Sequence, residues 1–271
     1  MNDTILPSLN NYIQLDPVQE QSFRKNGHTL INAVLSAEEV SVYRNIINEA
    51  AYKYNTEKRK LEERDTYGRA FLQIMNLWEL DMQVRQFTLA KRFAKIAAGL
   101  LGVENVRLYH DQALYKEPGG GFTPWHQDQY YWPLSTTNTV TMWMPLIDIN
   151  EEMGMLTFAS GSHKNGSVKN IAISDESEEA LNAYIAEQGY EISRAKAMNA
   201  GDATWHYGWT SHAAPGNNSD KTREIMTVIY FADGATVTTP INEHQEADRN
   251  KWLCGLEPGE LAASKLNPLV L

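Results

Sequence analysis

The beginning of the chain carries two successive patterns, which predict a helix followed by a strand. Asp16 before Pro17 is typical of a helix start and Gly27 of a helix end, so a short helix is expected over residues 17–26. The stretch His28–Ile31 then favours a strand.

Two longer stretches carry apolar residues every three or four positions, which predicts helices with one apolar face. The first begins at a capping-box pattern, Ser36 to Glu39, and its apolar stripe is Val40, Tyr43, Ile47 and Tyr54. The second ends at Gly102, and its stripe is Leu89, Phe93, Ile96 and Leu100. Helices are therefore expected to dominate the first hundred residues, and the first stripe is expected to pack on a sheet.

The region between these two helices divides into a polar and an apolar segment. Thr56–Arg69 is polar and mixed in charge, which is typical of a solvated connection but also of a mobile lid near a site. Of these two interpretations we favour the solvated connection. Phe71–Trp78 is apolar and compatible with a strand.

In the middle of the chain the pattern changes to short β-favouring runs, separated by clusters of Gly, Pro, Asn and Ser. These runs are Val106–Tyr115, Tyr130–Trp132, Thr139–Ile149, Met155–Ala159, Ala203–Trp209 and Glu224–Phe231. In the third run Thr141 and Trp143 are two positions apart and should share one face of a strand. Asp175–Gln188 predicts an inserted surface helix ending at Gly189, and the chain from Pro240 onward is loop-rich.

Length and composition fit one globular unit. The chain has 271 residues, of which 42% are apolar, enough to bury a substantial core. No repeat and no linker divides it. We expect a single domain over residues 1–271, with a helical part to about residue 104, a β core over about 105–233 and a loop-rich tail.

The charge pattern excludes two classes of partner. The net charge is −10 and the longest basic block is the triplet Lys58-Arg59-Lys60, so nothing favours nucleic acid or an anionic membrane surface. Cys254 is the single cysteine and cannot form an internal disulfide, and the first thirty residues lack the pattern of a secretory signal. No stretch approaches the about 18 to 20 apolar residues that span a bilayer. These features predict a cytoplasmic protein that acts on a small molecule.

The most informative stretch for chemistry is Trp125 to Trp132, which follows the flexible run Pro118 to Gly121. In it His126 and Asp128 are two positions apart, so on a strand both side chains leave the same face. A His-x-Asp pair supplies two of the three protein ligands of the facial triad that binds non-haem Fe(II). Such a pair also occurs by chance on surface strands and turns, so the assignment depends on a third ligand.

The third ligand is expected at His212, and an arginine follows it. Arg223 lies eleven positions beyond His212, at the start of the last β-favouring run, which is far enough for a hairpin return that brings both side chains into one cavity. The rigid donors of a guanidinium match the two oxygens of a carboxylate. A metal triad beside such an arginine indicates a co-substrate that carries a carboxylate.

At this point the sequence resembles the phytanoyl-CoA dioxygenase family of Fe(II)/2-oxoglutarate oxygenases. The resemblance rests on His126-x-Asp128, the distal His212, Arg223 and the segment from Gly154 to Lys164, which contains the turn Gly161-Ser162-His163. It covers roughly residues 105 to 233 well and the helical part in outline.

The resemblance implies a mainly β fold, a double-stranded β-helix or jelly-roll related to the cupins, with N-terminal helices beside it. It implies that His126, Asp128 and His212 bind iron and that Arg223 binds the distal carboxylate of 2-oxoglutarate. It also places Gln112 and Trp143 in the co-substrate pocket, with Thr141 beside them. A lysine that some members use upstream of the core has no counterpart near Phe71–Gln73.

Other histidines and aromatic residues have a plainer interpretation. His110, His163 and His206 are expected to be structural, hydrogen-bonded residues rather than ligands. Seven aromatic residues favour strands, and about half are expected to line the substrate chamber because alternate side chains face inward; they are Trp125, Tyr130, Tyr131, Trp132, Trp205, Tyr207 and Trp209.

The leading hypothesis is an oxygenase that uses Fe(II), 2-oxoglutarate and O₂, with ascorbate as a stimulant. It hydroxylates a small molecule, or oxidatively dealkylates or desaturates it, while 2-oxoglutarate is decarboxylated to succinate and CO₂. One alternative is a cupin-type metal dioxygenase or isomerase that needs no 2-oxoglutarate. Another is a jelly-roll protein that binds a ligand without catalysis.

Overall fold

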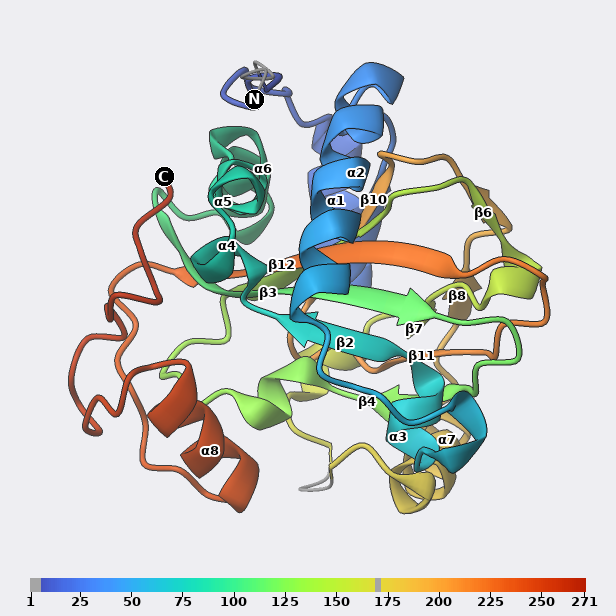
Figure 1. The fold of residues 1–271 in the computed structure, drawn as a ribbon. Coiled ribbons are helices and arrows are strands. Elements are labelled where there is room, and N and C mark those ends of the chain that lie inside the picture. The colour runs from blue at the N-terminus through green and yellow to red at the C-terminus, as the bar shows by residue number, and fades with distance from the viewer. Residues whose placement is uncertain (1–5, 169–171) are drawn as a thin grey trace.

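The computed structural model describes residues 6–168 and 172–271, and in them two antiparallel sheets form the centre of the molecule (Figure 1). The larger sheet has the order β1-β10-β5-β12-β3-β2 and the smaller one β4-β11-β7-β8, with a separate pair β6-β9. The strands of the larger sheet are β1 His28–Ile31, β2 Leu72–Met75, β3 Val106–Lys116, β5 Thr139–Pro145, β10 Ala203–Tyr207 and β12 Arg223–Ala232. The others are β4 Thr123–His126, β6 Ile149–Asn150, β7 Thr157–Ala159, β8 Ile192–Arg194, β9 Ala197–Met198 and β11 His212–Ala214.

The helices predicted from capping and periodicity are present. Helix α1, Pro17–Asn26, begins at a capping box on Asp16 and ends at Gly27, which has a φ of 84° that a glycine adopts without strain. Helix α2, Ala37–Tyr54, begins at the capping box of Ser36 and Glu39. The remaining longer helices are α6 Lys91–Leu101 and α7 Asp175–Gln188, both followed by a left-handed glycine.

Several boundaries differ from the prediction. Tyr130–Trp132 is not a strand, because most of it belongs to the 3₁₀ turn η2, Asp128–Tyr131. The tail after Pro240 is not only loop, since it contains helix α8, Glu243–Lys251. Two short helices, α4 Leu77–Leu80 and α5 Met82–Thr88, precede α6 and were not predicted. Helix α5 has a local cap, because the side chain of Asp81 accepts hydrogen bonds from the amides of Gln83 and Val84. The first amides of α4 instead donate to the carboxylate of Asp111 on β3, a contact distant in sequence.

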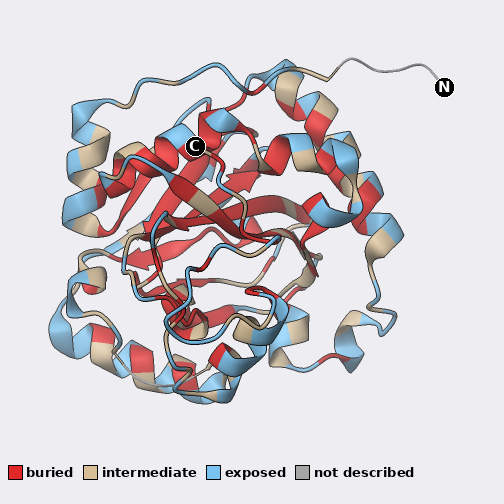
Figure 2. Cartoon of the chain, turned by 90° about the vertical axis from the view of Figure 1, so that its left-hand side faces the viewer, coloured by how far each residue is buried: buried red, intermediate tan, exposed pale blue. Residues whose placement is uncertain are grey.

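The main apolar core lies between the N-terminal helices and the larger sheet. Tyr43 and Ile47 of α2 are buried in it, together with Trp205 of β10 and Tyr230 of β12. Figure 2 shows the result, with buried residues along the sheets and exposed ones on the outer helix faces. The stripe on α2 therefore packs inward as predicted, although Tyr54 at its end is only partly buried. Among the described residues no helix is both long and apolar enough to cross a bilayer.

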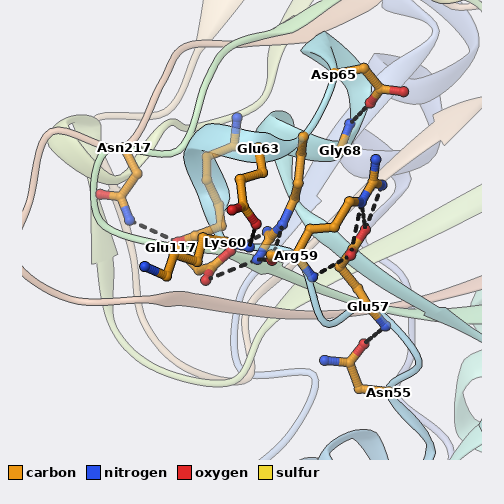
Figure 3. A network of polar contacts seen from close by, with 11 residues as sticks. Asn55, Glu57, Arg59, Lys60, Glu63, Asp65, Gly68, Glu117 and Asn217 are labelled. Atoms are coloured by element: carbon orange, nitrogen blue, oxygen red, sulfur yellow. Dashed lines mark hydrogen bonds and ion pairs between the residues drawn. The ribbon is translucent and has the colours of Figure 1, made fainter.

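The polar segment 56–69 is mostly exposed to solvent, as favoured from the sequence, but it also carries regular structure and specific contacts. It contains the 3₁₀ turn η1, Leu61–Glu63, and the start of helix α3, Thr66–Ala70. Figure 3 shows polar contacts of this segment, among them that of Arg59 with Glu57. Arg64 donates to the Glu117 carboxylate and to the carbonyl of Arg59, and its side chain is only 5% exposed. The segment is thus fastened to the end of β3, and it places Tyr67 at the wall of the central cavity.

Candidate metal centre and co-substrate pocket

Two histidines face each other across the smaller sheet. His126 ends β4 and His212 begins β11, and their Cα atoms are direct antiparallel partners, with ring centroids 4.0 Å apart. In each ring Nδ1 lies close to the carbonyl two residues earlier, 2.8 Å from Pro124 O and 2.9 Å from Thr210 O. A proton on Nδ1 makes these hydrogen bonds, which leaves Nε2 of both rings free to bind a metal ion.

Asp128 brings a carboxylate to the same point. It is the first residue of η2 and not part of a strand, but Gln127 before it is still extended, with φ −126° and ψ 122°. The side-chain alternation therefore continues one residue past β4, and Asp128 lies on the same side as His126. Its Oδ1 is 3.5 Å from Nε2 of His126 and 3.6 Å from Nε2 of His212. One donor atom from each of the three residues lies within 4.8 Å of the others.

The second oxygen of Asp128 is held by two other residues. Thr141 donates from Oγ1 to Oδ2 at 2.8 Å, and Nε2 of His206 is 3.2 Å from the same atom. Thr141 and His206 are Cα partners on the adjacent strands β5 and β10. Oδ2 is thereby engaged with the larger sheet, while Oδ1 is left facing the two histidines.

The electrostatics of the cluster suit a cation. Burial, with the neighbouring His126 and His206, holds the pKa of His212 well below its usual value, so this ring is neutral, as a metal ligand must be. Burial by itself raises the pKa of Asp128, but the surrounding histidines outweigh it and hold that pKa well below the usual range. Two imidazoles and one carboxylate leave coordination positions open and fit Fe(II).

The triad opens into a cavity of about 480 Å³, walled by residues of both sheets and of the segments around them. Arg223, the first residue of β12, lies in this wall and is 2% exposed. It donates from Nη1 to the carbonyl of Gly154, and its guanidinium carbon is 5.3 Å from the ring centroid of Trp143.

Arg223 lacks an acidic partner. Among the described residues no carboxylate lies within ion-pair distance of it, and its Nε has no hydrogen bond. Burial lowers the pKa of this guanidinium to about 9, which reflects the cost of an unpaired buried charge. An anion bound from the cavity would remove that cost.

Lys116 is a second buried basic residue, and it was not predicted from the sequence; burial and the neighbouring Arg223 lower its pKa to about 6. It is the Cα partner of Arg223 on β3 and is fully buried. Its Nζ lies 2.6 Å from Gly121 O, 3.0 Å from Pro215 O and 3.3 Å from Thr123 Oγ1, so it joins the loops beside the site. The signal in the sequence that could have indicated a buried lysine is the position of Lys116 directly after the β-favouring run Val106–Tyr115.

The other residues predicted to line the co-substrate pocket all lie in the cavity wall; they are Gln112, Thr141 and Trp143. Gln112 accepts a hydrogen bond from Gln73 at 2.9 Å, and Gln73 in turn accepts one from Tyr67 at 3.0 Å. Gln73 thus lies in the region where the sequence lacks the family's lysine. Trp143 and Thr141 also line the cavity. Thr141 in addition donates a hydrogen bond to Asp128.

The aromatic wall is built differently from the prediction. Of the seven aromatic residues named, Tyr131 and Trp132 line the cavity, but Trp205 is buried in the main core and Trp125 packs in the cluster under α7. The other aromatic wall residues come from outside that set; they are Tyr67, Phe71, Trp143 and Trp252. Trp205 lies on β10, where its neighbour His206 faces the cavity, so alternation turns Trp205 toward the main core. Tyr131 and Trp132 reach the cavity from the 3₁₀ turn η2 and the position after it, not from a strand.

The three histidines expected to be structural differ in position. His163 lies outside the cavity wall, stacked on Tyr207 with ring centroids 5.1 Å apart, and contacts the carbonyl of Arg24. His206 contacts Asp128 as described above. His110 lines the cavity, and burial lowers its pKa to about 3, which keeps it neutral.

The fold and the donor set together define the class of Fe(II)/2-oxoglutarate-dependent oxygenases. The family model "Phytanoyl-CoA dioxygenase (PhyH)" matches residues 23–225, and the chain belongs to this family. It is therefore an enzyme that uses iron and 2-oxoglutarate.

Known relatives agree with this assignment. A probable alpha-ketoglutarate-dependent hypophosphite dioxygenase of Stutzerimonas stutzeri is 23% identical over 231 residues, which are 80% of this chain and 79% of that protein. Among solved structures, the carbocyclase SnoK from nogalamycin biosynthesis superposes with a TM-score of 0.78 at 24% identity, covering 98% of this chain and 99% of SnoK. The epimerase SnoN, in complex with Fe³⁺, alpha ketoglutarate and nogalamycin RO, gives 0.76 at 23% identity, covering 94% and 100%. The predicted double-stranded β-helix is thus confirmed at the level of the fold.

Proposed function

We propose that this enzyme hydroxylates a small molecule, or oxidatively dealkylates or desaturates it, and converts 2-oxoglutarate to succinate and CO₂ in the same cycle. His126, Asp128 and His212 hold the iron, and Arg223 binds the distal carboxylate of 2-oxoglutarate. The observation that carries the proposal is the unpaired Arg223 guanidinium, buried in the same cavity wall as the three converging donor atoms. In a site that bound no carboxylate, the energetic cost of burying this unpaired charge would not be offset.

The protein's own residues orient the metal ligands and the co-substrate. The backbone carbonyls of Pro124 and Thr210 fix the tautomer of the two histidines. The ring of Trp143 lies against the guanidinium of Arg223, which restricts the orientation of the guanidinium in the cavity wall. Gln112 and Thr141 add polar groups to the same wall, and iron and 2-oxoglutarate, when bound, supply the oxidising power that the side chains lack.

A screen for substrate-stimulated succinate formation tests the proposal. The purified protein is given Fe(II), 2-oxoglutarate, O₂ and ascorbate, which is expected to stimulate, together with a panel of small molecules. A substrate should raise succinate formation in step with loss of its own hydrogen, and ¹⁸O₂ should label a hydroxylated product. Substrate turnover that continues without 2-oxoglutarate would instead favour a cupin-type dioxygenase or isomerase.

A further inference from the structure

One end of the cavity is formed by a helix that lies outside both sheets. Helix α8 contributes residues at spacings of three, four and seven to the cavity wall; they are His244, Ala247, Asp248 and Lys251. The buried side chain of Gln245 donates to the carbonyl of Tyr130, 3.1 Å away, in the same turn that carries Asp128. Figure 1 shows α8 beside this turn, at the lower left. The cavity face of α8 is thereby fixed relative to the metal centre.

Asp248 is the acidic group in this face. Its Oδ2 accepts a hydrogen bond of 2.9 Å from the hydroxyl of Tyr109, which is itself fully buried on β3. Within the described ranges, no lysine, arginine or histidine lies within ion-pair distance of its carboxylate. Burial raises the pKa of Asp248 to about 7, so the ionised form is costly here without a partner. A positive charge delivered from the cavity would stabilise it.

Aromatic side chains line the same cavity as Asp248. Tyr131, Trp132 and Trp252 all line the cavity. The exposed ammonium of Lys251 lies 4.3 Å from the ring centroid of Trp252, so this indole already receives a cation on its face. A carboxylate combined with electron-rich ring faces is the chemistry that recognises an alkylammonium group.

Tyr131 connects this end of the cavity with the metal centre. Its pKa is raised to about 12, chiefly by burial, and the negative charges of Asp128 and Asp248 both contribute. The Tyr131 hydroxyl therefore interacts electrostatically with both carboxylates. A molecule anchored at Asp248 would extend past Tyr131 toward the open side of the triad, while Arg223 is left for 2-oxoglutarate.

We propose that Asp248 anchors a basic nitrogen of the primary substrate, so that this oxygenase acts on an amine small enough for the cavity. The inference rests on the proposed function, because it assigns the substrate end of that same site. It also gives a reason for a carboxylate without an ion-pair partner, among the described residues, at this end of the cavity: the ion pair is completed when the substrate binds, and a neutral analogue leaves the carboxylate unpaired.

Two probes of one skeleton test the inference. N,N-dimethylbenzylamine is cationic at neutral pH and N,N-dimethylbenzamide is neutral, and both are titrated into protein loaded with Mn(II) and 2-oxoglutarate. Binding is read from the paramagnetic broadening of the probe protons, which requires no turnover. The amine should bind the wild type at least about tenfold more tightly than the amide, as expected for a charge-assisted contact. Equal binding of the two probes, or binding of neither, would overturn the inference.

Variants of residues on α8 test whether the preference for the amine depends on Asp248. Asp248→Asn keeps an acceptor for Tyr109 and should weaken the amine about tenfold or more while leaving the amide unchanged. Glu246→Gln is the matched control, because Glu246 is on the same helix but is exposed and paired with Arg249. Asp248→Glu retains the charge and should keep the preference for the amine even where Asp248→Asn folds poorly. An amine affinity unchanged in Asp248→Asn would contradict the inference.

The same samples separate the two proposals. The dissociation constant of 2-oxoglutarate is measured for each loaded protein, and Asp248→Asn should leave it unchanged. Failure of the wild type to bind 2-oxoglutarate would count against the proposed function. Normal 2-oxoglutarate binding without a preference for the amine would count only against the role of Asp248.

Discussion

The two ends of the cavity are held in place in different ways. At the metal end the functional groups lie in or directly beside strands, and their orientation is fixed by ladder pairing and by short contacts to backbone carbonyls, as for His126 and His212. Elsewhere the cavity wall includes residues of α3 and α8, which lie outside the sheets and are held partly by side-chain contacts such as those of Arg64 and Gln245. A site built on strands is positioned more rigidly than one built on peripheral elements.

This difference teaches how one fold can keep its chemistry and change its substrate. Replacing residues on α3 or α8 leaves the strand pairing of the triad intact, so substrate recognition and oxidation are separable. The following changes test this separation, beginning with the one of largest expected effect.

Replacing a member of the triad should abolish turnover without unfolding the protein. His212→Ala removes one of three donor atoms that converge within 4.8 Å, so Fe(II) binding should be lost together with succinate formation. Metal content of the purified variant and succinate release are the measurements. His163→Ala is the control, since this histidine lies outside the cavity wall and should retain activity. Full activity in His212→Ala would refute the metal assignment.

Arg223→Lys should weaken 2-oxoglutarate more than the primary substrate. The lysine keeps the charge but loses the two-pronged contact with a carboxylate, and a charge-assisted hydrogen bond contributes about 1.5 to 3 kcal/mol. The apparent affinity for 2-oxoglutarate should therefore fall about tenfold to a hundredfold.

The control for Arg223→Lys is Arg44→Lys. Arg44 holds the adjacent Glu224 through two contacts of 2.6 and 2.7 Å and does not line the cavity, so its replacement should leave 2-oxoglutarate binding unchanged. An unaltered 2-oxoglutarate requirement in Arg223→Lys would show that the co-substrate binds elsewhere.

Thr141→Val should loosen the metal site without emptying it. The valine cannot donate to Oδ2 of Asp128, so this oxygen keeps only its contact with His206, and iron affinity should fall about tenfold. An anaerobic Fe(II) titration measures this directly. Thr204→Val on the neighbouring β10 is the control, because the Thr204 hydroxyl is buried without a hydrogen bond among the described residues. Equal iron affinity in the two variants would remove the positioning role of Thr141.

Arg64→Ala should have the smallest effect on chemistry and a local effect on structure. Without the contact to Glu117, the segment 56–69 should open more often, which is seen as faster amide exchange and protease cleavage there. Binding of 2-oxoglutarate should stay unchanged because Arg223 is on a strand of the larger sheet. Arg59→Ala is the comparison, since Arg59 pairs with Glu57 at the surface. Faster exchange at β12 in Arg64→Ala would contradict the separation of the two ends.

Local sequence determined much of the scaffold. The capping boxes of Asp16 and Ser36 and the glycine after α1 act over three or four residues, so both bounds of α1 and the start of α2 follow from the sequence. The His-x-Asp spacing also places both side chains on one side, because a single extended residue separates them. Such signals are readable because their causes lie within one turn of helix or one step of strand.

Only the tertiary structure decided which distant groups share the cavity. The contacts of Asp128 with Thr141 and His206 span 13 and 78 positions, and that of Asp248 with Tyr109 spans 139. Lys116 beside Arg223 depends on the register of β3 with β12. None of these pairings leaves a periodic trace in the sequence, because each depends on how sheets and helices pack and not on the residues next to it. The chain therefore specifies its helix ends and candidate ligands locally, while packing alone fixes what supports the metal centre and what faces the substrate.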